Sequence, residues 1–128
     1  SWLIPYPIEQ KISMTESFQQ ALHWLNTNPS VVKPIHHTTR TFGFALSDGR
    51  QLAIKPLKTQ VTVFAEPGAW VDKLPIEWTF VRYAPDKTRS SNLRNCAPRL
   101  DKGSSAVSLA LTSYADFERF MRLYAAEA

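Results

Sequence analysis

Cysteine is almost absent from this sequence, which contains a single one, Cys96, among its 128 residues. One thiol cannot form a disulfide within the chain, and it cannot supply the several thiolates of a structural zinc site. The fold must therefore be held by a hydrophobic core, and roughly two-thirds of the unfolded surface can be buried at this length. The low cysteine content fits a reducing compartment, so we expect a cytoplasmic protein.

The sequence also lacks long apolar runs. No stretch is long and apolar enough to cross a membrane as a helix, so no membrane partner is expected. No charged stretch is followed by the apolar core of a signal peptide. The chain begins at Ser1 without a methionine, which we interpret as the start of an excised domain or of a processed form. We expect one domain over residues 1–128, a module of a larger protein whose other domains would be partners.

Catalytic motifs are missing as well. The patterns G-x-S-x-G, G-x-G-x-x-G, H-E-x-x-H and the P-loop do not occur. The histidines, His23, His36 and His37, have no carboxylate at zinc-motif spacing, and adjacent histidines in a strand would point to opposite faces. We therefore expect no metal, no cofactor and no catalytic residue. A small nuclease or hydrolase with an unrecognised site is kept as an alternative.

Positive charge is in excess, and it is concentrated in two central segments. The net charge of the chain is +4. Residues 33–58 contain five basic side chains and one acidic, and residues 82–102 contain six basic and two acidic, so each segment carries +4. The rest of the chain, at −4, is acidic. A basic centre in an acidic frame favours an anionic partner.

Apolar spacing predicts one helix near each end of the chain. Apolar residues at helical spacing and a capping-type pair, Ser13 with Glu16, predict a helix over residues 15–27. The same spacing, after a cap signal at Ser113, predicts a second helix over residues 114–126.

Between these helices, alternating apolar residues predict about five strands. The turn Asp48-Gly49 separates two of them as a hairpin, because glycine adopts the positive φ of a tight turn at little cost. The expected strands are residues 41–47, 51–55, 60–65, 77–84 and 106–112. Both faces of the strand at 77–84 carry large side chains, so we expect it to be a central strand.

The order of helix, strands and helix argues against a doubly wound parallel sheet, which needs strands and helices in alternation. An antiparallel sheet can bury one face under helices and leave the other in water, which suits the alternating strands. The fold class is therefore α+β: a mostly antiparallel sheet of about five strands, with the N-terminal and the C-terminal helix packed on it.

A connection of about 20 residues joins the last two expected strands, and connections of this length are often functional. This long loop, residues 85–105, is rich in arginine, lysine, serine and asparagine. Guanidinium groups bind phosphate in a bidentate manner, and asparagine also reads base edges. The apolar residues Leu93, Cys96, Pro98 and Leu100 are expected to fix the loop to the body of the protein, which lowers the ordering cost of binding.

We therefore predict a nucleic-acid interface made by the long loop and the hairpin around Gly49, with DNA favoured over RNA. The residues expected to contact phosphates or bases are Arg40, Arg50, Lys55, Arg82, Arg89, Asn92, Arg94, Asn95, Arg99 and Lys102. Trp70, in a turn-rich stretch, and Tyr83 are candidates for stacking on bases. The alternative is an interaction or assembly domain whose basic surface meets an acidic protein partner.

Overall fold

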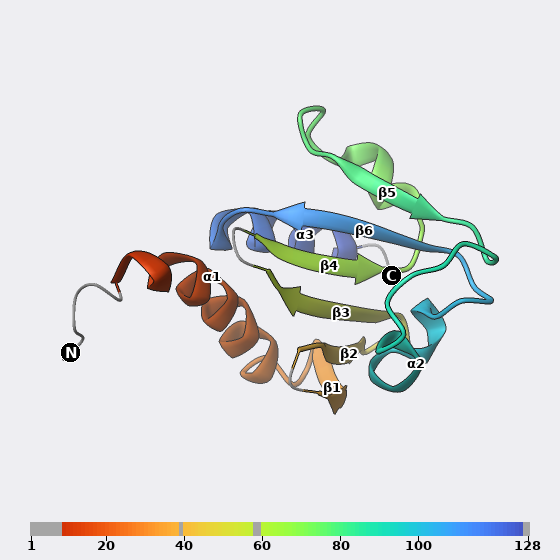
Figure 1. Cartoon of the computed structure of the whole chain (residues 1–128), viewed down its shortest axis with the longest axis horizontal. Helices are drawn as coiled ribbons and strands as arrows, with labels where there is room; N and C mark the ends of the chain where they lie inside the picture. Colours follow the sequence, from red (N-terminus) through yellow and green to blue (C-terminus); the bar gives the residue numbers. More distant parts are fainter. Residues whose placement is uncertain (1–8, 39, 58–59, 127–128) are drawn as a thin grey trace.

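An antiparallel β-sheet forms the centre of the fold (Figure 1). The computed structural model describes residues 9–38, 40–57 and 60–126, and these contain six strands. In sequence order the strands are β1 (Val32–His37), β2 (Phe42–Leu46), β3 (Gln51–Pro56), β4 (Val61–Ala65), β5 (Phe80–Tyr83) and β6 (Ala106–Leu111). Their order in the sheet is β1-β2-β3-β4-β6-β5, and every neighbouring pair is antiparallel.

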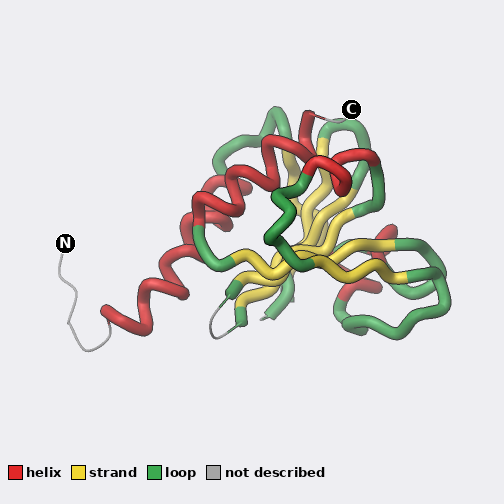
Figure 2. Tube along the Cα trace, turned by 90° about the horizontal axis from the view of Figure 1, so that it is seen from above, coloured by secondary structure: helices red, strands yellow, loops and turns green. Residues whose placement is uncertain are grey.

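Helices cover one face of the sheet (Figure 2). They are α1 (Glu9–Asn26), α3 (Tyr114–Ala126) and a short 3₁₀ helix, η2 (Ala69–Lys73). α3 buries Phe117, Phe120 and Tyr124 in the core, and Trp24 of α1 packs edge-on against the ring of Phe117 at 6.2 Å. Removing such side chains from water is the main driving force for folding. Within the described ranges, no helix combines the length and the apolar character that crossing a membrane requires.

The long loop covers part of the opposite face. It contains two short helical segments, α2 (Leu93–Cys96) and η3 (Pro98–Leu100). In β4, Val63 and Ala65 face the helices, whereas Phe64 belongs to a second, smaller apolar cluster on the other face. The buried members of this second cluster are Ala53, Phe64 and Ala106 from the strands and Leu93, Ala97 and Leu100 from the long loop. The sheet is therefore packed on both faces, by helices on one and by a loop on the other.

The α+β class, the antiparallel sheet and the two terminal helices confirm the fold that the sequence predicts. α3 begins after Ser113, whose Oγ accepts the backbone N–H of Asp116 over 3.2 Å. Gly49 has a φ of 93° in the turn between β2 and β3. These elements are predicted correctly because helix caps and tight turns depend on residues close together in the chain.

The strand prediction needs two corrections. β1 is an additional strand, and it contains Pro34, which an edge strand tolerates because one side of its backbone pairs with no neighbour. β5 is not central but lies at the other edge of the sheet, and it is only four residues long. The large side chains on its two faces are exposed: Phe80 by 38% and Val81 by 42%.

The start of the first helix also differs from the prediction. α1 begins at Glu9, so Ser13 and Glu16 lie inside the helix and do not cap it. The segment before Ser13 contains Glu, Gln and Lys, which are good helix formers, so the helix extends toward the N-terminus past the apparent cap.

Gly43 of β2 lies where the long loop comes closest to the sheet. A Cβ atom at this position would lie 1.7 Å from the backbone oxygen of Cys96. We predict that Gly43→Ala lowers the free energy of unfolding by about 3 kcal/mol, because the loop or the strand has to move. Urea unfolding measures this loss, and Ala110→Ser, at an exposed position of β6, is the control that should change little. An unchanged unfolding midpoint for Gly43→Ala would contradict the close packing.

Candidate functional site

Apolar side chains fix the long loop to the sheet. Leu93, Cys96 and Leu100 are fully buried, which confirms three of the four expected anchors, whereas Pro98 is exposed. Cys96 Sγ lies 3.5 Å from the backbone oxygen of Thr41, just before β2. The thiol is therefore a packing group that faces the sheet, and the loop around it has a defined shape.

Arg89 ties the two ends of the long loop together. Its guanidinium donates hydrogen bonds to the backbone oxygens of Ala84 over 2.6 Å, of Leu100 over 3.0 Å and of Ser104 over 2.7 Å. Hydrogen bonds from a charged donor are roughly twice as strong as those between neutral groups. A guanidinium that the sequence assigns to phosphate binding thus has its donors engaged within the loop.

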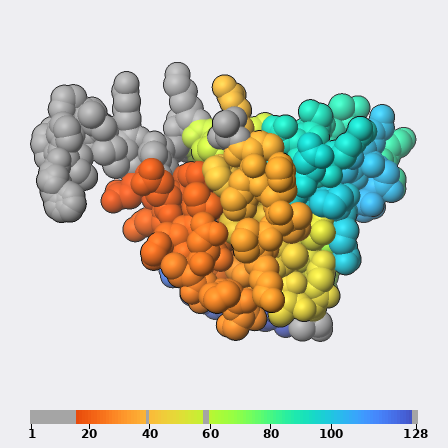
Figure 3. Space-filling model, turned by 90° about the horizontal axis from the view of Figure 1, so that it is seen from below, coloured from red at the N-terminus to blue at the C-terminus, as the bar shows by residue number. Residues whose placement is uncertain are grey.

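A second set of hydrogen bonds joins the long loop to the hairpin of β2 and β3. Arg99 Nη2 lies 2.8 Å from Glu66 Oε1, and Arg99 Nη1 donates to the backbone oxygen of Gly49 over 3.0 Å. The backbone N–H of Arg99 donates to Gln51 Oε1 over 2.9 Å. Glu66 Oε2 accepts the backbone N–H of Gln51 over 2.8 Å. Figure 3 shows the hairpin, in orange and yellow, beside the long loop in cyan.

Tyr124 of α3 belongs to the same network. Its hydroxyl donates to the backbone oxygen of Gln51 over 2.7 Å and accepts the backbone N–H of Glu66 over 3.0 Å. Arg50 lies 4.5 Å from the centre of the Tyr124 ring, donates to the Tyr124 backbone oxygen over 2.7 Å and pairs with Asp48 at 2.8 Å. Burial raises the pKa of Tyr124 well above its ordinary value. Arg50, another predicted phosphate ligand, is thus also engaged inside the protein.

Several other predicted contact residues remain exposed. The Arg94 side chain is 83% exposed, and its Nε lies 3.6 Å from Asp101 Oδ2, which makes a long and solvated ion pair. Arg40, Arg82, Asn95 and Lys102 of the predicted set are also exposed, and the Arg99 side chain is 53% exposed although it pairs with Glu66. These side chains are the ones available to a ligand at the surface.

Two members of the predicted set are partly buried. Asn92 Nδ2 lies 3.4 Å from Thr41 Oγ1, so Asn92 sits where the long loop meets the sheet. Lys55 follows Ala53 by two residues in β3, which places it on the sheet face that carries the long loop. Neither residue is as accessible as Arg94.

Trp70, predicted to be a stacking residue, is a core residue in the structure. Its side chain is fully buried, and its ring packs edge-on against Phe120 at 5.5 Å and Tyr124 at 5.2 Å. Its indole N–H donates to the backbone oxygen of Glu66 over 2.8 Å. The turn-rich sequence around Trp70 suggests an exposed ring, but η2 directs the ring into the core. Stacking on a base is therefore excluded for this side chain in the folded protein.

Tyr83, the second stacking candidate, is half-buried at the end of β5. Its ring centre lies 5.9 Å from that of Phe64. Lys87 Nζ and the Arg89 guanidinium carbon lie 5.0 Å and 5.1 Å from the same ring centre. A base that stacked on Tyr83 would compete with these cation–π contacts.

Glu66, Gln51 and Tyr124 are structural members of the site that the sequence prediction misses. Apart from Trp70, their partners stand 15 to 74 positions away in the chain, a separation over which no local spacing pattern operates. The single available signal is the position of Glu66, a carboxylate directly after the apolar run of β4.

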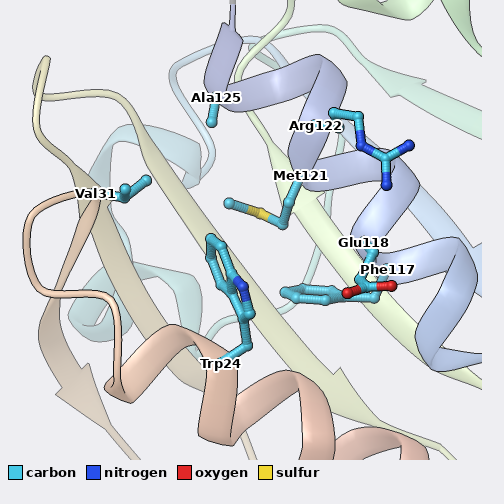
Figure 4. Close-up of a pocket in the computed structure, with 7 residues that line it drawn as sticks. All are labelled: Trp24, Val31, Phe117, Glu118, Met121, Arg122 and Ala125. Carbon is cyan, nitrogen blue, oxygen red and sulfur yellow. The ribbon is translucent and has the colours of Figure 1, made fainter.

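An apolar cavity of about 270 Å³ lies on the helix face, between α1 and α3 (Figure 4). Trp24 and Met121 point toward each other across it, with the ring of Phe117 below, whereas Arg122 points away. In the part of the chain that the structure describes, no group of three or more His, Cys, Asp or Glu side chains is placed to hold a metal ion. The cavity thus offers apolar contact surface and a single carboxylate, Glu118.

These observations define the class of protein as an α+β domain with an antiparallel sheet, helices on one face and an anchored polar loop on the other. No protein-family model matches the chain, and no curated protein and no solved structure shows significant similarity to it. A function can therefore be inferred only from the side chains at the surface of the fold.

We predict that Arg89→Gln loosens the long loop and leaves the sheet folded. Glutamine cannot replace the guanidinium that contacts five separate backbone oxygens, so amide hydrogen exchange within the long loop should accelerate about tenfold. Arg94→Gln, which removes an exposed charge from the same loop, is the matched control and should leave the exchange rates unchanged. Equal exchange in the two variants would show that Arg89 does not hold the loop.

We also predict that stability falls above about pH 10, where tyrosine in an unfolded chain loses its proton. The pKa of Tyr124 is raised in the folded protein, so the unfolded chain releases this proton first. The stabilisation is fully present below about pH 10 and is lost as the pH rises toward the raised pKa. Thermal unfolding at a series of pH values measures this loss.

Tyr124→Phe is the control for the pH dependence. It should be less stable at neutral pH by about 1–3 kcal/mol, because the backbone N–H of Glu66 and the backbone oxygen of Gln51 lose their partner. Its midpoint should then fall less steeply than that of the parent between neutral and alkaline pH. Parallel curves for the two proteins would assign the alkaline loss to other groups.

Proposed function

We propose that this domain binds nucleic acid, with DNA favoured over RNA, through the long loop and the adjoining hairpin. The observation that carries the proposal is the division between arginines that hold the loop, Arg89 and Arg99, and polar side chains left exposed on it. Among the exposed ones are Arg94, Asn95 and Lys102, which belong to the predicted set. A loop with a fixed shape loses little conformational freedom when a ligand binds.

The proposed contacts follow from the position of each side chain. Arg94 and Lys102 of the long loop, with Arg40 and Lys55 beside it, contact phosphates, and Asn95 contacts base edges. Phosphate contacts release counterions, so the affinity depends strongly on salt. Three arginines of the predicted set already pair with carboxylates: Arg50 with Asp48 and Arg99 with Glu66 at 2.8 Å, and Arg94 with Asp101 at the longer distance of 3.6 Å. The number of free cations is therefore smaller than the sequence suggests, and we expect few phosphate contacts.

The proposal is tested by measuring the binding of labelled duplex DNA and labelled single-stranded DNA over a range of salt concentrations. The parent domain should lose affinity with salt, with a slope of about −0.9 in log–log form for each phosphate contact on a duplex. Arg94→Ala combined with Lys102→Ala should weaken binding about tenfold or more and reduce the slope by about 2.

The matched control removes two charges from the opposite face, by Arg119→Ala combined with Arg122→Ala on α3, where both side chains are exposed. An equal loss in the two double variants would mean that net charge alone, and no interface, attracts the nucleic acid. The absence of binding to either DNA at low salt would overturn the proposal. Binding of an acidic polypeptide in its place would support an interaction domain.

A further inference from the structure

The two edges of the sheet differ in how well they are protected. β1 contains Pro34, and the pairing register between β1 and β2 shifts between Pro34 and His36. A proline and a bulge at an edge both hinder pairing with another strand. β5 has neither, and it pairs with β6 in an uninterrupted register. Within the described ranges, no strand pairs with the outer edge of β5.

Exposed apolar side chains lie in this edge strand and just before it. Ile76 is 98% exposed, Val81 is 42% exposed and Phe80 is 38% exposed. Phe80 and Val81 project from opposite faces of β5, so each face of this open edge carries an exposed apolar side chain. Figure 1 shows β5 at the upper margin of the sheet, with the preceding connection projecting beyond the other strands.

We propose that β5 pairs with β5 of a second copy of this chain, antiparallel and about a two-fold axis at Val81. This register places Val81 opposite the partner's Val81 and each Phe80 opposite an Arg82. Within one chain the Arg82 guanidinium lies 5.4 Å from the centre of the Phe80 ring, and this register places a second Phe80 ring, the partner's, opposite the same guanidinium. A register centred on Arg82 would instead place two like charges opposite each other, which is unfavourable.

The register also determines on which side of the joined sheet the helices of each copy lie. Opposed residues of antiparallel strands project from the same side of a sheet. Phe80 and Arg82 oppose Leu109 and Val107 of β6, which belong to the core beneath the helices. The helices of both copies therefore lie on one side of the joined sheet, and both long loops lie on the other.

Sedimentation over a concentration series tests the pairing. An interface of one short strand is small, so we expect a dissociation constant weaker than about 1 µM. Val81→Lys should weaken association at least about tenfold, because a lysine on a strand edge opposes pairing. The matched control is Ile35→Lys on β1, a partly exposed apolar residue at the opposite edge, which should leave association unchanged. A parent chain that stays monomeric throughout the series, or equal effects of the two substitutions, would overturn the proposal.

A disulfide test examines the register directly. Opposed residues of antiparallel strands have Cα atoms about 4.5 or 5.5 Å apart, within the range that a disulfide spans. Val81→Cys should therefore form a linked dimer at least about tenfold faster under mild oxidation than Thr79→Cys, which this register does not place opposite itself. The native Cys96 is buried and does not interfere. Equal rates for the two cysteine variants would refute pairing at Val81.

Discussion

Glu66 is the residue on which the arrangement of this domain depends, because each of its polar groups binds a different part of the chain. One carboxylate oxygen accepts the backbone N–H of Gln51 in β3, and the other pairs with Arg99 in the long loop. Its backbone N–H donates to Tyr124 of α3, and its backbone oxygen accepts the indole N–H of Trp70. A single, largely buried residue directly after β4 thus connects the long loop on one face of the sheet with the helices on the other. Removing a partner from such a network leaves buried polar groups unsatisfied, which costs more than one hydrogen bond contributes.

The parts of the fold that could be predicted from the sequence are those that depend on neighbouring residues. The cap at Ser113 and the turn at Gly49 are local, and both have the expected conformation. The errors concern the edges of the sheet, where pairing on one side only changes what a strand tolerates. Pro34 makes the sequence of β1 look unlike a strand. The large side chains of β5 suggest a buried central strand, although Val81 is exposed.

For the candidate site, the sequence indicates the loop and most of its anchors, but it does not separate one arginine from another. Arg89 and Arg94 stand five positions apart in the same polar stretch, yet the first binds five backbone oxygens and the second is largely exposed to water. The partners of Arg89 become neighbours only when the loop closes, and those of Arg99 only when the hairpin docks. Whether a charge stabilises the fold or is free for a ligand is therefore decided by tertiary structure.

Because the long loop is closed at its base, its exposed residues can change in sequence without disturbing the sheet. β5 and β6 are adjacent strands, so the loop is the tip of a hairpin, and the backbone N–H of Gly103 donates to the oxygen of Pro85 over 2.7 Å across its base. A segment closed at its base can change its exposed residues while the sheet keeps its pairing. If Leu93 and Leu100 are retained to cover the sheet, and Arg89 and Arg99 to hold the loop in place, the chemistry of the other exposed loop residues is exchangeable independently of the fold. The exposed chemistry of the loop and the stability of the sheet are thus separable, so an evolving or engineered version can alter the first without losing the second.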